Sequence, residues 1–259
     1  MTTRPSRSSR PAVQPPPLPL PQPDARPLRT RRPWYHATNA AFQAFEHGHS
    51  YRRDWNAYLG VHFARTPAPA HNALKDKNTT GNDSPTGANV IRAHLTGQAA
   101  HVTSEGHLTA LAVEVGLRAG WFDQPGRVVT FEDMQALKRH VGTLHPDSRS
   151  VNYAALERAL RAGNTDALHA DEGLAALCVL DMQHAVLPGP QYRTAIKELA
   201  AHLREHLTAQ GINVIVYPND IEGGISAAVL NLTAIRCPFD PTRPWSNPWA
   251  PDRPNQESA

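Results

Sequence analysis

The chain has 259 residues and a net charge of +3, and its positive charge is concentrated at one end. Residues 1–33 hold seven arginines against one acid, so residues 34–236 carry about −2, which weakens a nucleic-acid-binding interpretation of the core. The two cysteines lie far apart with no CxxC, which excludes a disulfide framework and a cysteine-based metal site. No apolar run reaches 18 residues and no signal peptide is recognisable. We therefore expect no membrane association, and a protein that is cytoplasmic or delivered into a target cell.

Both ends of the chain are predicted to be disordered. Residues 1–33 contain ten prolines and show no apolar periodicity, and residues 237–259 contain six prolines. Such segments bury too little apolar surface to offset the entropy lost on ordering. Residues 34–236 have the length of one domain with a single core.

The first part of this domain is predicted to form strands. Residues 32–38, 58–65 and 88–97 combine apolar and β-branched residues, and in the second of these His62 alternates with its apolar neighbours. Thr66 followed by proline predicts a helix start, because the threonine can cap the helix and proline suits its first position. Residues 77–88 have the composition of a loop.

The middle of the domain is predicted to be helical, and its end returns to strands. A capping-box-like start at Thr130 opens the helical block, and residues 191–211 form its clearest helix, ending at Gly211. The apolar face of that helix comprises Ile196, Leu199, Leu203 and Leu207. Two apolar runs then follow between residues 212 and 232. Strands, a helical block and strands again predict an α+β fold.

Two acids, Asp220 and Glu222, lie in the polar turn between the last two apolar runs. Their alternation in an extended stretch allows both to face one side, and burial beside a strand end tunes a carboxylate for chemistry. Taken alone, a hydrophilic turn explains them better, because Asp and Gly are common in turns.

A second motif, HxxEH, lies in the helix at 191–211. It consists of His202, Glu205 and His206, the order of the reversed zinc-peptidase motif. A zinc site also needs a third ligand well downstream, where little folded chain remains, so the motif alone is weak. We therefore predict no metal.

Three stretches, in this order, resemble the ADP-ribosyltransferase superfamily, particularly its phage-borne and toxin-like bacterial members. WYHAT, followed by FQAF, resembles the opening YHGT strand and the F-x-x-F that follows it. LGVHFARTPAPAHNAL resembles the G-[ILV]-[HY]-F-[AG]-T strand and its alanine-rich helix. INVIVYPNDIEGGISAAVLNLTAIR resembles the closing GYDGIVYxNExEGxxSYIVFxPxQIK segment and is the most specific of the three. No motif covers the central helical block.

The resemblance implies a split β-sandwich core with an inserted helical block and a site for NAD, which is the substrate. His36 corresponds to the histidine that hydrogen-bonds the adenosine ribose. His62 corresponds to the residue that stacks on nicotinamide and is usually a tyrosine. Their neighbours complete the implied NAD-binding set, with alanine in place of the usual glycine after the first histidine: Tyr35, Ala37, Thr38 and Phe63.

The resemblance also implies the catalytic residues. Glu222 corresponds to the catalytic glutamate, and its carboxylate would stabilise the oxocarbenium-like centre formed when the nicotinamide–ribose bond breaks. Asp220 replaces the first glutamate of the E-x-E pair and would orient or deprotonate the acceptor. The implied activity is NAD-dependent mono-ADP-ribosyl transfer to an acceptor that is protein or nucleic acid.

Alternatives remain open at this point. With water as the acceptor the enzyme is an NAD glycohydrolase. A non-catalytic module that binds NAD or ADP-ribose is compatible with His62 and with Asp220 in place of glutamate. An RNA 2′-phosphotransferase of related fold is disfavoured, because that family relies on arginines flanking its histidines.

Overall fold

The computed structural model describes residues 25–28, 32–38, 42, 44–47, 55–70, 72–73, 89–118, 180, 189–219 and 222–246. The helices predicted between residues 119 and 179, the loop predicted at 77–88 and Asp220 lie outside these residues. Within the described ranges, no helix is both long enough and apolar enough to cross a membrane.

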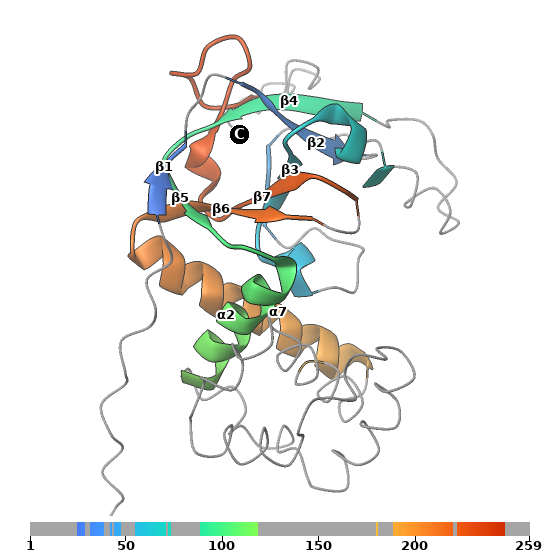
Figure 1. The fold of residues 1–259 in the computed structure, drawn as a ribbon, viewed down its shortest axis with the longest axis vertical. Coiled ribbons are helices and arrows are strands. Elements are labelled where there is room, and N and C mark those ends of the chain that lie inside the picture. The colour runs from blue at the N-terminus through green and yellow to red at the C-terminus, as the bar shows by residue number, and fades with distance from the viewer. Residues whose placement is uncertain are drawn as a thin grey trace, which may run out of the picture.

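Eight strands form one open, mixed sheet in the order β1-β5-β6-β7-β3-β2-β4-β8 (Figure 1). Neighbouring strands are antiparallel except β5 and β6, which are parallel. The strands are β1 Ala25–Pro27, β2 Trp34–Thr38, β3 Val61–Ala64, β4 Asn89–Leu95, β5 Gln98–His101, β6 Ile212–Pro218, β7 Ile225–Val229 and β8 Ile235–Arg236. With helices packed on one face, the fold is α+β, as the order of predicted elements indicated.

Two α-helices, α2 (Glu105–Arg118) and α7 (Gly189–Ala209), lie on the same side of the sheet (Figure 1). The predicted apolar face of α7 is buried against the sheet and α2. The chain leaves α7 through Gly211, whose φ of +79° is a conformation that glycine adopts without Cβ strain. Short 3-10 helices, η1 (Trp55–Tyr58) and η4 (Leu232–Ala234), precede β3 and β8.

Helix α2 and strand β5 were not predicted from the sequence. The side chain of Ser104 caps α2 by accepting a hydrogen bond from the backbone N–H of His107 at 3.0 Å. Every residue from 108 to 115 is then buried. A helix that is buried on most of its surface lacks the one-sided apolar pattern by which a surface helix is recognised.

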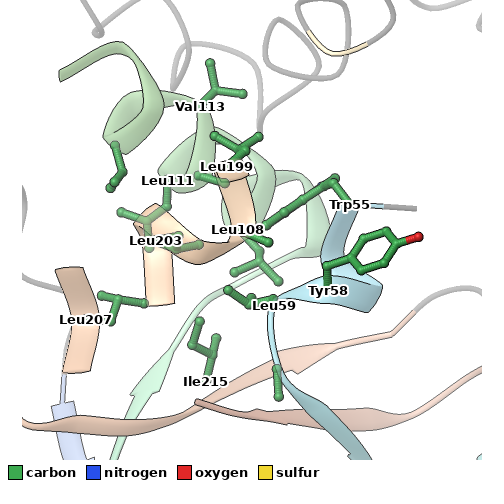
Figure 2. Close-up of a cluster of buried hydrophobic side chains, with 14 of the residues drawn as sticks. Trp55, Tyr58, Leu59, Leu108, Leu111, Val113, Leu199, Leu203, Leu207 and Ile215 are labelled. Carbon is green, nitrogen blue, oxygen red and sulfur yellow. The ribbon is translucent and has the colours of Figure 1, made fainter. Parts of the chain in front are cut away.

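The sheet has an apolar core on each face. Figure 2 shows the larger core, in which side chains of α2 and α7 meet those of η1, β6 and the chain entering β3: Trp55, Tyr58, Leu59, Leu108, Leu111, Leu199, Leu203, Leu207 and Ile215. The smaller core, on the opposite face, contains Trp34, Val61, Phe63, Val214 and Ala227 among others.

Both segments predicted to be disordered tails contribute to the described fold. Strand β1 lies within residues 1–33 and pairs with β5 at the sheet edge, where a proline is tolerated. At the other end, the backbone N–H of Trp245 donates to the carbonyl of Ile235 at 3.1 Å, and its side chain packs against the smaller core. Local composition does not register such long-range pairing, so the predicted boundaries at 33 and 237 do not mark where contacts with the core end.

Candidate active site

The three stretches that carry the family resemblance come together on neighbouring strands. Ala64 of β3 pairs with Tyr35 of β2 on one side and with Ser226 of β7 on the other. The turn that contains Glu222 leads directly into β7. Strand pairing therefore places the two candidate histidines and the candidate glutamate on, or directly before, three adjacent strands.

Strands β2 and β3 share only one register pair, Tyr35 with Ala64, whereas β2 has five with β4. Beyond that pair, the side chain of His36 bridges the two strands, and its Nδ1 lies 2.7 Å from the backbone carbonyl oxygen of His62. Because a carbonyl oxygen only accepts, Nδ1 of His36 carries a proton and donates this hydrogen bond.

Aromatic side chains fix the plane of the His36 ring. Phe42 and Phe45 meet it edge-on, with centroids 6.3 and 5.2 Å away, and Phe63 lies 5.4 Å away on the same face of the sheet. Trp245 packs in turn on both Phe42 and Phe45. The F-x-x-F of the resemblance thus supports His36, and the fully buried Phe63 acts as a packing partner of that ring.

His62 lies on the opposite face of the sheet from His36, among the residues that face α2 and α7. Its Nε2 is 2.7 Å from the carbonyl oxygen of Asn56 and its Nδ1 is 2.9 Å from the hydroxyl of Tyr217. The carbonyl oxygen only accepts, so Nε2 donates this hydrogen bond, while Nδ1 is hydrogen-bonded to the Tyr217 hydroxyl. Since both nitrogens are engaged, a ligand contact to His62 uses the ring face, the mode that the resemblance implies.

The remaining residues of the implied NAD-binding set lie on strand β2. Ala37 and Thr38 are buried in β2, and Tyr35 is half-buried against a small cluster that includes Ala64 and Ala70. The helix predicted after Thr66 is present at residues 67–70 and 72–73. It packs over the same cluster and so borders the site.

Glu222 is held by a buried asparagine, Asn219, which is 6% exposed. The side-chain Oδ1 of Asn219 accepts the backbone N–H of Glu222 at 3.0 Å, and its Nδ2 donates to Glu222 Oε2. The same Nδ2 donates to Ser226 Oγ at 3.1 Å. The turn also needs Gly223 and Gly224, whose φ angles are +83° and +82°. The carboxylate of Glu222 is thereby brought back toward the first residues of β7.

The Glu222 turn packs against the helix at 67–73. The side chain of Asn72 donates to the backbone carbonyl of Glu222 at 3.4 Å, and a Cβ added to Gly224 would lie 3.6 Å from Pro69. Arg65 connects this region to β7 and β2. Its backbone N–H donates to the carbonyl of Ile225 at 2.8 Å, and its guanidinium lies 5.0 Å from the ring centroid of Trp34. Burial, and then the nearby Arg32, lower the pKa of Arg65, but an arginine stays charged at any physiological pH.

Sequence analysis identified Glu222 but not the residues that hold it. Asn219 falls on the asparagine of the NExEG pattern in the closing segment, so a signal for it was present. Tyr217, which contacts the ring of His62, falls on the tyrosine of the same pattern, whereas Asn56 carries no motif signal. Asp220 lies outside the described residues, so its predicted role as the acceptor-directed acid stays a prediction.

The HxxEH motif lies on α7, away from the turn. Nε2 of His206 contacts the side-chain amide of Gln210 at 2.6 Å. Among the residues that the structure describes, no three His, Cys, Asp or Glu side chains are grouped to hold a metal ion. The zinc-peptidase interpretation therefore finds no third ligand there.

Comparison with known proteins does not assign the chain to a family. No protein-family model, no curated protein and no solved structure matches it.

Proposed function

We propose that the chain is an NAD-dependent mono-ADP-ribosyltransferase. The observation that carries the proposal is the position of the Glu222 carboxylate, held at the start of β7, with β3 and β2 as the next two strands. Two strand spacings are about 10 Å. That span is within the reach of an extended dinucleotide, although the side chains of His36 and His62 lie on opposite faces of the sheet.

The ladder between β2 and β3, with its single register pair, is compatible with the split core that the family resemblance implies. His36 lies where this pairing stops, and the resemblance assigns it the contact with the adenosine ribose of NAD.

The chemistry of the reaction suits a single, well-placed carboxylate. When the bond between nicotinamide nitrogen and ribose C1′ breaks, nicotinamide takes the electron pair and leaves as a neutral base, so no acid has to protonate it. Positive charge develops on the ribose, and Glu222 stabilises it more in the transition state than in the ground state. The acceptor then forms the new bond to C1′ and loses its own proton to a base.

The test is nicotinamide release from NAD by the wild type, by Glu222→Gln and by Glu205→Gln. Glu205 is an exposed glutamate on α7, so it serves as a matched control for the loss of one carboxylate. We expect Glu222→Gln to lower the rate by about 10²-fold or more and Glu205→Gln to leave it unchanged. Equal rates in all three proteins would contradict the proposal. Labelled NAD with a cell lysate then separates transfer to a macromolecule from glycohydrolysis, in which all the label stays in free ADP-ribose.

A second candidate is a non-catalytic NAD- or ADP-ribose-binding module. It is favoured by His62, whose ring nitrogens are both hydrogen-bonded within the protein and whose position in the family that the chain resembles is often a tyrosine. Imidazole gives a smaller stacking surface than phenol. NAD binding of equal strength in wild type and Glu222→Gln, without nicotinamide release in either, would favour this candidate over the enzyme.

A further inference from the structure

We infer that Asn219 is the residue that positions the Glu222 carboxylate for the reaction. This inference rests on the proposed function, because it assigns a role within the same site. Its basis is that one buried side chain contacts both the backbone and the carboxylate of Glu222.

The orientation of the Asn219 amide is fixed by its partners. The backbone N–H of Glu222 can only donate, so the side-chain atom facing it is Oδ1. The amino group, Nδ2, therefore faces Glu222 Oε2 and Ser226 Oγ. Its donors thus point at one oxygen of the carboxylate and at the side chain of the first buried residue of β7, Ser226, which is 5% exposed.

The turn is closed by a backbone hydrogen bond from the N–H of Asn219 to the carbonyl of Gly224 at 2.8 Å, which does not involve the side chain of Glu222. Glu222 is followed by two glycines at positive φ, and its side chain has three rotatable bonds. The Asn219 side chain restricts Glu222 at two points, since one of its atoms contacts the backbone N–H and another contacts the carboxylate. A fixed carboxylate is what electrostatic stabilisation of a transition state requires.

A turn-stabilising role alone does not account for this arrangement. An asparagine that only stabilises a turn accepts a backbone N–H and leaves its amino group in water. Here Asn219 is buried and its amino group is directed at Glu222. The two functions of the amide are separable by substitution. Asn219→Asp keeps the shape and the acceptor but replaces the donor, whereas Asn219→Ala removes both.

The experiment measures kcat and KM for nicotinamide release in wild type, Asn219→Ala, Asn219→Asp and Asn213→Ala. Asn213 is the matched control. It lies near the start of β6, the strand that Asn219 directly follows, and its side chain likewise accepts a backbone N–H, that of Gln98, at 3.1 Å. We expect Asn219→Ala to lower kcat by about 10²-fold with little change in KM, the cost of a misplaced catalytic group. Asn213→Ala is expected to lower the melting temperature similarly but to keep kcat.

The pH profile of Asn219→Asp gives a readout that a structural role does not move. Near neutral pH the introduced carboxylate repels Glu222, and we expect kcat as low as in Asn219→Ala. At acidic pH the protonated carboxyl can donate a hydrogen bond again, and kcat relative to wild type is expected to rise. A kcat within threefold of wild type in Asn219→Ala would overturn the inference. So would an equal loss in Asn213→Ala, or a rise in KM that accounts for the whole effect.

A readout independent of activity separates this inference from the proposed function. Hydrogen exchange at the backbone amide of Glu222, followed by NMR, is expected to be roughly fivefold or more faster in Asn219→Ala and unchanged in Asn219→Asp, which keeps the acceptor. If the wild type releases no nicotinamide, the proposed function fails while the exchange rates still decide whether Asn219 holds Glu222. Unchanged exchange in Asn219→Ala would overturn the positioning whatever the activity.

Discussion

Gly60, directly before β3, lies against the backbone of β7. A Cβ atom at this position would lie 2.4 Å from the carbonyl oxygen of Val229 and 2.9 Å from its carbonyl carbon. Val229 pairs with Val61 on one side and with Val214 on the other. Because the contact is with ladder backbone and not with a flexible side chain, it can be relieved only by moving β3 away from β7. We therefore predict that Gly60→Ala destabilises the fold.

The magnitude follows from two opposing effects. Overpacking a close-packed site costs about 1–3 kcal/mol, and the rigid partner places this position near the upper end. Alanine also reduces the conformational entropy of the unfolded chain, which offsets about 0.4–1 kcal/mol of that cost. The net loss is about 2 kcal/mol, equivalent to a fall in Tm of about 4–8 °C for a domain of this size.

The assay is thermal and urea unfolding followed by circular dichroism, with Gly189→Ala as the control. Gly189 is the first residue of α7, and a Cβ added there meets nothing within 4 Å. Its replacement by alanine is expected to be neutral or slightly stabilising. If Gly60→Ala unfolds within about 1 °C of the wild type, the close approach of Gly60 to β7 is refuted.

Three further substitutions test other parts of the fold. Leu203→Ala removes a fully buried side chain of α7, and we expect urea unfolding to show a loss of about 2–5 kcal/mol; a loss below about 1 kcal/mol would contradict the core described above. Burial, and then the nearby Arg204, lower the pKa of His47, against a backbone hydrogen bond that raises it. The unfolded chain therefore binds a proton at this histidine more readily than the folded chain, so the free energy of unfolding falls as the pH drops through about 6.5. We expect His47→Gln to reduce the slope of the unfolding free energy against pH, and equal slopes in the two proteins would contradict this expectation. Tyr217→Phe removes the hydroxyl that lies 2.9 Å from Nδ1 of His62, and we expect a loss of about 1 kcal/mol; a Tm equal to that of wild type would show that this contact is energetically silent.

The local sequence pattern was sufficient to predict the elements that have one apolar and one polar face. The helix predicted at 191–211 corresponds to α7, and its four apolar positions are all buried. Alternation along β3 correctly predicted that His62 lies on the opposite face of the sheet from Val61 and Phe63. By contrast, β5 has only four residues, of which the middle two are alanines, so it offers almost no alternation to recognise. The edge strand β1 depends on a partner far along the chain and has no local signature.

The candidate site, too, could be predicted from the sequence only in part. The residue types and their order pointed to His36, His62 and Glu222, because motif positions are properties of the sequence. Which face each histidine occupies relative to the other depends on the pairing of β2 with β3, and that pairing is long-range. The role of Asn219 depends on the path of the turn through two glycines at positive φ, which no spacing rule specifies.

The burial of the two polar residues on either side of the turn, Asn219 and Ser226, argues against the hydrophilic hairpin that residue statistics favour. A turn that serves only solubility keeps its amide and hydroxyl groups in water, yet Asn219 and Ser226 are both buried. Burying an amide costs free energy unless each donor and acceptor finds a partner. Two of the partners found here belong to Glu222. If the turn were merely hydrophilic, an apolar replacement of Asn219 would be tolerated and Glu222 would change independently of it. If the turn is a site, the two residues are coupled, and a double-mutant cycle of Asn219→Ala with Glu222→Gln on kcat will show strong non-additivity.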